Sequence, residues 1–130
     1  MRKTENLPRI CVGVDLHKKQ YTVHAVNEET GEMVLSGVYL TTADGYKDFI
    51  EKLHAIETET ECEIALAVEA TGNARYFKNK MEAEGFSVAV VNTSKFKVIT
   101  MSTKKTDSND AATLAFYLSK DMLPESYLCD

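Results

Sequence analysis

The stretch that decides the fold is Ile10-Cys11-Val12-Gly13-Val14-Asp15, in which a nearly apolar run ends in a carboxylate. A second run of the same kind, Ile64-Ala65-Leu66-Ala67-Val68-Glu69, follows later in the chain. Short continuous apolar runs are typical of strands that are buried on both faces of a sheet. Packing alone does not readily explain an acid at the end of each run, so Asp15 and Glu69 are candidates for a functional site.

Strand and turn patterns surround the first run. Alternating residues at 20–27 and a β-rich segment at 33–40 are separated by a polar turn, which predicts a three-stranded antiparallel meander. A helix should follow, because apolar residues recur at helical spacing after Thr42, a candidate N-cap. The apolar positions of this helix are Phe49, Ile50, Leu53 and Ile56.

The second apolar run is followed by two helices and a strand. One helix is predicted from residue 73 or 74 to Glu84, with Gly85 as its left-handed C-terminal cap. A strand is predicted over 87–92, and a last helix from about Asp107 to Ser119. The resulting order, β-β-β-α-β-α-β-α, predicts an α/β protein with a ribonuclease H-like fold. Its five-stranded mixed sheet would have the first strand parallel to the fourth.

This topology brings acids together. Neighbouring strands lie about 4.8 Å apart, so Asp15 and Glu69 at corresponding strand ends could share a metal ion. Ligands of open α/β sheets usually bind beyond these carboxyl ends. Asp107 and Asp110 are spaced i, i+3 and therefore share one face of the last helix. We expect the four carboxylates to converge on one metal site.

Oxygen-only ligands favour a hard cation such as Mg²⁺ or Mn²⁺ over zinc. Such a site serves phosphoryl transfer, in which two ions stabilise the attacking and leaving oxygens. Each acid also has a structural alternative. Asp107 could cap the last helix and Asp110 complement its dipole, while Asp15 could accept hydrogen bonds from the turn after its strand. Glu69 could pair with Arg75 or a lysine.

The charge distribution adds a basic segment. The 130-residue chain has a formal net charge of -5, yet residues 94–105 contain four lysines and no acid. These are Lys95, Lys97, Lys104 and Lys105. A basic patch beside an acidic cluster suits a metal site that holds a phosphate backbone, although a solvated lysine-rich loop is the alternative. Two bound divalent ions would bring the charge to about -1, so the acidity does not exclude nucleic acid.

The remaining features indicate one cytoplasmic domain. No apolar run approaches the ~18 residues that span a bilayer, and the polar start lacks a signal peptide. Residues 1–9 are predicted to be a polar tail, 10–120 the domain, and 121–130 the start of a connection. Cys11, Cys62 and Cys129 form no metal-binding pattern and are expected to be reduced thiols. His17 lies two residues after Asp15 and can reach the same face of an extended segment.

Three motifs resemble a known family: VGVDLHK at 12–18, AVEATG at 67–72 and KTDSNDAA at 105–112. The chain resembles, over nearly its whole length, the N-terminal domain of DEDD-type insertion-sequence transposases, relatives of the Piv DNA invertase. The resemblance implies a RuvC-like catalytic domain whose acidic tetrad is Asp15, Glu69, Asp107 and Asp110. His17 departs from the family pattern, in which serine is common at this position.

The resemblance also implies partners beyond this domain. Family members act on DNA in the bacterial or archaeal cytoplasm, are thought to use a structured non-coding guide RNA, and are thought to assemble as homo-oligomers. Their C-terminal domain supplies a serine nucleophile, and no such domain follows here before Asp130. We therefore expect a metal-binding domain that does not complete transposition alone.

Two other functions remain open. An ATPase half of the actin-like or sugar-kinase type also begins with G-x-D on a strand, but it predicts a glycine-rich phosphate loop after that strand. The segment His17-Lys18-Lys19 contains no glycine. A non-catalytic module for nucleic-acid binding or oligomerisation would use the acids structurally, and its metal response would not depend on Asp15.

Overall fold

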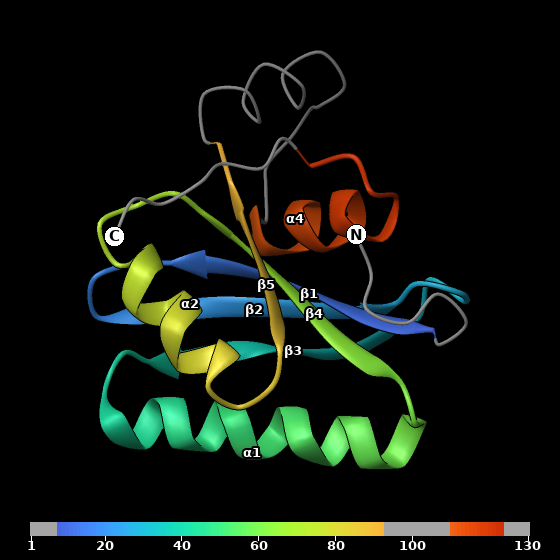
Figure 1. The fold of residues 1–130 in the computed structure, drawn as a ribbon, viewed down its shortest axis with the longest axis horizontal. Helices are drawn as coiled ribbons and strands as arrows, with labels where there is room; N and C mark the ends of the chain where they lie inside the picture. Colours follow the sequence, from blue (N-terminus) through green and yellow to red (C-terminus); the bar gives the residue numbers. More distant parts are fainter. Residues whose placement is uncertain (1–7, 93–109, 124–130) are drawn as a thin grey trace.

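The computed structural model describes residues 8–92 and 110–123, which form five strands and three helices in the predicted order. Figure 1 shows their arrangement. In chain order the elements are β1 (Arg9–Leu16), β2 (Gln20–Asn27), β3 (Met33–Leu40), α1 (Ala43–Thr60), β4 (Glu63–Glu69), α2 (Ala74–Glu82), β5 (Ser87–Val91) and α4 (Asp110–Ser119).

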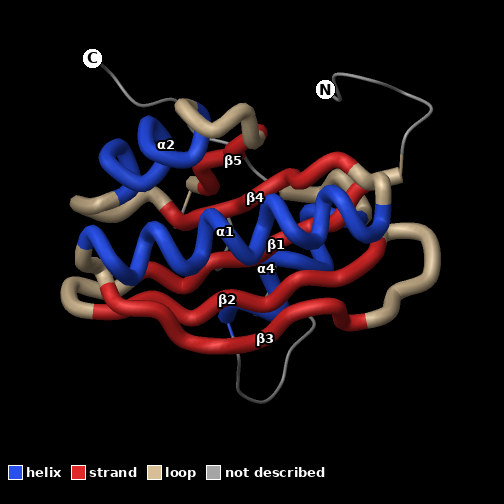
Figure 2. Tube along the Cα trace, turned by 90° about the horizontal axis from the view of Figure 1, so that it is seen from below, coloured by secondary structure: helices blue, strands red, loops and turns tan. Residues whose placement is uncertain are grey.

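The five strands form one mixed sheet in the order β3-β2-β1-β4-β5. β1, β2 and β3 pair antiparallel as the predicted meander, whereas β4 is parallel to both β1 and β5. The prediction that the first and fourth strands are parallel neighbours is confirmed. Figure 2 shows α1 on one side of the sheet and α4 on the other.

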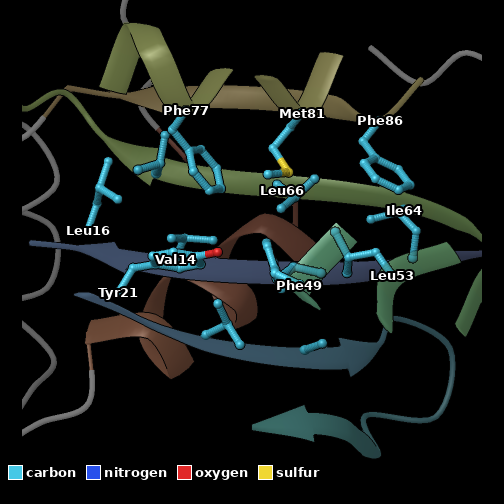
Figure 3. Packing of buried hydrophobic residues seen from close by; sticks show 14 of the residues in the cluster. Val14, Leu16, Tyr21, Phe49, Leu53, Ile64, Leu66, Phe77, Met81 and Phe86 are labelled. Carbon is cyan, nitrogen blue, oxygen red and sulfur yellow. The ribbon is translucent and has the colours of Figure 1, made fainter. Parts of the chain in front are cut away.

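The larger core lies between the sheet and the two helices α1 and α2. Its largest fully buried side chains include Tyr21 of β2, Phe49 of α1 and Phe77 of α2, whose rings contact one another. Figure 3 shows these residues between the helices and the inner faces of the strands. Burying each such side chain stabilises the fold by about 1.5–3 kcal/mol, so this layer fixes how the helices sit on the sheet.

Local signals set the helix ends. The Thr42 hydroxyl accepts a hydrogen bond from the Gly45 amide at 3.1 Å, which confirms the predicted N-cap of α1. After α2, Gly85 has φ 92°, and the Phe86 amide donates to the Met81 carbonyl at 3.2 Å. This left-handed glycine cap was predicted. α2 itself ends at Glu82, two residues before the predicted end at Glu84.

α4 covers the other face of the sheet with small and aliphatic side chains. The residues predicted to be buried are Ala111, Leu114, Ala115 and Leu118, and all four are. Leu114 and Leu118 pack in one cluster with Cys11, Ala65 and Ala67, whose own small size lets the helix approach the sheet. The predicted start of this helix at Asp107 lies outside the described residues. No helix in the described part of the chain has the length and apolarity needed to cross a membrane.

Candidate metal centre

Asp15 and Glu69 occupy corresponding positions on neighbouring parallel strands. Val14 of β1 pairs with Val68 of β4, and each acid is the next residue along its strand. Both side chains are half-buried. β1 runs one residue beyond Asp15, because Leu16 points into the main core, so the acid lies within the strand end rather than after it. The predicted pairing of these two acids at one edge of the sheet agrees with this register.

The two acids also face the same side of the sheet. Cys11, Ala65 and Ala67 pack in the cluster beneath α4, and side chains alternate between faces along a strand. Asp15 follows Cys11 by four residues, and Glu69 follows Ala67 by two. Both carboxylates therefore lie on the α4 face, where the helix that carries Asp110 is packed.

Gly13 brings the first turn of α4 against β1. A Cβ atom at Gly13 would lie 2.6 Å from the Ala115 amide nitrogen and 2.9 Å from Leu114 Cβ, and would also overlap the Ala111 carbonyl oxygen. Only glycine permits this backbone approach. Because Asp110 precedes Ala111 and Asp15 lies two residues after Gly13, the start of α4 is held near the strand end that carries Asp15.

Arg9 fixes the opposite end of α4. Its buried guanidinium donates to the Leu118 carbonyl at 3.3 Å and to Asp121 Oδ1 at 3.0 Å. It also forms an ion pair with Glu28 at 3.0 Å. α4 therefore runs antiparallel to β1, with Leu118 beside Arg9 and Ala111 beside Gly13. Sequence reasoning did not identify Arg9 or Gly13 as residues that position the site.

His17 contacts Asp15 directly. Its Nε2 lies 3.1 Å from Asp15 Oδ2, and the two side chains are 61% and 29% exposed. The prediction that His17 reaches the same face as Asp15 is confirmed. One oxygen of Asp15 therefore has an imidazole partner on the solvent side, and an incoming cation would compete with it.

The turn after β1 adds positive charge to this end of the sheet. Lys18 and Lys19 are exposed. The Lys18 carbonyl accepts a hydrogen bond from the Thr41 hydroxyl at 2.7 Å, and the Lys19 carbonyl accepts one from the Thr41 amide at 3.0 Å.

Tyr76, in the first turn of α2, adds an exposed aromatic ring. Its side chain is 57% exposed, and its ring centroid lies 5.6 Å from that of Tyr46. The sequence reasoning missed these exposed residues as binding candidates, although a lysine pair directly after an acid-ending strand was a signal for them.

The other predicted site residues are only partly accounted for. Asp110 is the first residue of α4, so its backbone is placed but its side chain is not described. Asp107 and the lysines at 95, 97, 104 and 105 lie outside the described residues. Within 8–92 and 110–123, no group of three or more His, Cys, Asp or Glu side chains is close enough to hold a metal ion. The described residues thus provide two carboxylates of the predicted four.

The sequence matches the family model DEDD_Tnp_IS110, described as a transposase, over residues 12–127. No curated protein matches it significantly. RuvC of T. thermophilus, solved in complex with a Holliday junction substrate, has a similar structure with a TM-score of 0.51 at 14% identity. That alignment covers 91% of this chain and 99% of RuvC.

Two further structures are less similar. One is a Bacteroides thetaiotaomicron protein with an actin-like ATPase fold and unknown function, with a TM-score of 0.45 at 14% identity over 68% of this chain. The other is an exopolyphosphatase from Cytophaga hutchinsonii, with a TM-score of 0.43 at 10% identity over 65% of this chain. This chain spans 34% of the length of each. The likeness to RuvC confirms the ribonuclease H-like fold, and because the transposase model matches most of its length, the chain belongs to the DEDD transposase family DEDD_Tnp_IS110.

Proposed function

We propose that this chain is the metal-binding catalytic domain of a DNA transposase, in which Asp15, Glu69, Asp107 and Asp110 hold Mg²⁺ or Mn²⁺. One observation carries the proposal. Asp15 and Glu69 follow the paired residues Val14 and Val68, and they face the helix that begins with Asp110. Membership of a transposase family supports the reaction class.

The donor set fits a hard divalent cation. Both described donors are carboxylates on adjacent strands, and oxygen ligands of this kind suit Mg²⁺ or Mn²⁺. Half-burial leaves each acid accessible from the α4 side while the sheet holds its backbone in place. When bound, such ions supply charge stabilisation for the attacking and leaving oxygens of a phosphodiester.

The chain's own residues orient these donors. Gly13 and Arg9 fix the two ends of α4 along β1, so the helix start cannot move away from Asp15 without losing the packing at Gly13 and the contacts of Arg9 with Leu118 and Asp121. The acids would thus be preorganised before a ligand arrives, which lowers the cost of binding.

We further propose that DNA contacts the same end of the sheet through Lys18, Lys19 and Tyr76, together with the predicted lysines Lys95, Lys97, Lys104 and Lys105. Exposed lysines beside the acids can neutralise backbone phosphates. Tyr76 is held by Tyr46 and presents a ring on which a base can stack. A guide RNA, further subunits and a serine from outside residues 1–130 remain predictions from the family resemblance.

Metal-linked stability tests the proposal. We expect the melting temperature to rise in millimolar Mn²⁺, because a ligand at about ten times its Kd adds about 1.4 kcal/mol. That free energy corresponds to a shift of roughly 3–8 °C in a domain of this size. Asp15→Asn and Glu69→Gln should remove the shift. Glu51→Gln, an exposed acid on α1, is the matched control and should keep it.

Stability measured without metal distinguishes acids that bind metal from acids that stabilise the fold. If Asp15 is a ligand, Asp15→Asn should stay within about 1 kcal/mol of the wild type in EDTA, because relief of repulsion from the other acids offsets the loss of the exposed pair with His17. If Asp15 is structural, this variant should lose more stability than that. A wild-type melting temperature that ignores both Mn²⁺ and Mg²⁺ would refute the proposal.

A further inference from the structure

Within residues 8–92 and 110–123, β3 is an edge strand that lacks the usual protection against pairing with another chain. It has a partner only on its β2 side, and in Figure 2 no described element lies beyond it. Its sequence, MVLSGVYL, contains no charged residue and no proline. Native edge strands are usually blocked by charges, prolines, bulges or very short length. Here the register shift near Val26 affects only the start of the eight-residue strand.

The outward-facing backbone of β3 can be identified from its register. The Thr41 amide donates to the Lys19 carbonyl at 3.0 Å, so the hydrogen-bonded pairs with β2 continue at Tyr39 and Gly37. The amides and carbonyls of the residues between them, Ser36 and Val38, therefore point away from β2. No strand in the described part of the chain pairs with these groups, so they offer a template for another strand.

The side chains at this edge are apolar and exposed. Val38 and Leu40 are each 56% exposed on the face that carries α4. On the opposite face, Tyr39 is half-buried, and nothing lies within 4 Å of a Cβ built at Gly37. An aromatic side chain directly across from an edge glycine covers its exposed backbone. A partner strand that brings a tyrosine opposite Gly37 would use this space.

A second copy of β3 is uncharged, has its own outward-facing backbone groups and carries a tyrosine that can lie opposite Gly37. We propose that two copies of this chain pair antiparallel through β3 about a two-fold axis at Val38, which joins their sheets into one. In this register Val38 opposes its own counterpart, Ser36 opposes Leu40, and Gly37 opposes Tyr39. Ser36 of each copy therefore faces Leu40 of the other, and Gly37 of each faces Tyr39 of the other, as a two-fold interface requires.

The charge of the edge favours a second copy over a charged partner. The chain carries a net charge of -5, but the uncharged strand allows two copies to approach without burying an ion. A single strand pair is smaller than a standard stable interface, so the dimer should be weak and depend on concentration. The metal-centre acids lie on the inner strands β1 and β4, so the pairing does not depend on the proposed function.

Sedimentation velocity over a range of protein concentrations tests the pairing. The wild type should show a monomer–dimer equilibrium, and Val38→Lys should raise the dimer Kd by about tenfold or more, because two lysines would face each other across the axis. Phe116→Lys is the matched control. Phe116 is also a large exposed apolar residue, at 53%, but it lies on α4, which packs on β1 and β2 rather than along β3. This variant should dimerise like the wild type.

Disulfide trapping tests the register and does not rely on the lysine variant. In a Cys129→Ser background, Val38→Cys should form a covalent dimer under mild oxidation, because opposed residues of a hydrogen-bonded pair lie about 5.5 Å apart at Cα. Phe116→Cys should not. A wild type that stays monomeric at all concentrations, or equal trapping of both cysteine variants, would overturn the proposal.

Discussion

Gly13 of β1 and Ala111 of α4 are in direct backbone contact, with no side chain between the strand and the helix. The contact joins the two segments that carry Asp15 and Asp110. Any atom added at Gly13 must push the helix away from the strand, because its nearest neighbours are backbone atoms rather than flexible side-chain ends. The close approach thus links the stability of α4 to the geometry of the candidate metal centre.

We predict that Gly13→Ala destabilises the protein by about 1–3 kcal/mol, the usual cost of overpacking. It should also weaken the Mn²⁺-linked rise in melting temperature, because α4 moves relative to Asp15. Urea denaturation and thermal melts with and without Mn²⁺ measure both effects. Gly72→Ala is the control, since a Cβ there meets nothing within 4 Å. Equal stability of the two variants would contradict the packing argument.

Arg9 should be worth several times more to stability than its exposed partner Asp121. Arg9 and Glu28 are each 8% exposed in their side chains, whereas Asp121 is 67% exposed. Arg9→Met leaves the Glu28 carboxylate buried without its cation, so we expect a loss of about 3–5 kcal/mol in urea denaturation. Asp121→Asn should cost less than about 1 kcal/mol.

The double variant Arg9→Met with Glu28→Gln separates the buried charge from lost packing. It should be more stable than Arg9→Met alone, because the carboxylate that was left behind is removed. A double variant no better than the single one would mean that Arg9 acts through packing of its stem and its bond to Leu118.

His54 should make stability depend on pH. Hydrogen bonds to Glu57 and Glu84 raise the pKa of the His54 imidazole above its usual value. A raised folded-state pKa gives stability that is fully present below the unfolded pKa of about 6.5 and is lost as pH rises through the folded value. His54 is 44% exposed, so the effect should be roughly 0.5 kcal/mol.

The measurement is the difference in unfolding free energy between the wild type and His54→Gln, followed from pH 5.5 to pH 9. We expect this difference to be largest at the acid end and to shrink toward the alkaline end. In a Glu57→Gln, Glu84→Gln background the pH dependence should flatten. A difference that grows with pH would contradict the assigned sign.

The fold could be read from the sequence where one local pattern allowed one structure. The apolar runs before Asp15 and Glu69 had to be central strands, and Thr42 and Gly85 marked helix ends through their own chemistry. The buried face of α4 also followed from its spacing. These features depend on residues close in sequence, and the pairing of β1 with β4 then followed from the order of elements.

The features that position the site could not be read in the same way. Arg9 contacts Glu28 and Asp121, which are far from it in sequence, and a lone arginine before a strand gives no sign of either partner. Gly13 acquires its role only when α4 packs on it. The small residues Ala111 and Ala115, one turn apart, were the available signal for a close helix approach.

His17 should compete with metal at Asp15. Its Nε2 lies 3.1 Å from the carboxylate oxygen, so His17→Ser frees one oxygen for a cation. We expect the apparent Kd for Mn²⁺, from metal-linked melting, to fall by a few-fold. His54→Gln is the control, because that histidine lies on α1 with its own acidic partners. Weaker binding in His17→Ser would instead make His17 a residue that helps to hold the metal.

The exposed lysines of the β1–β2 turn should contribute to DNA affinity in a salt-dependent way. Each lysine that neutralises a phosphate adds about 1 to the slope of log K against log salt concentration, so Lys18→Ala with Lys19→Ala should lower that slope by about 2. Lys104→Ala with Lys105→Ala is expected to act similarly. Fluorescence anisotropy with a labelled duplex, between about 50 and 200 mM salt, measures this slope.

Lys47→Ala with Lys52→Ala is the control, because it removes the same charge from exposed positions on α1 and should leave the slope unchanged. If all three pairs lowered the slope equally, overall charge rather than the end of the sheet that carries the acids would govern binding.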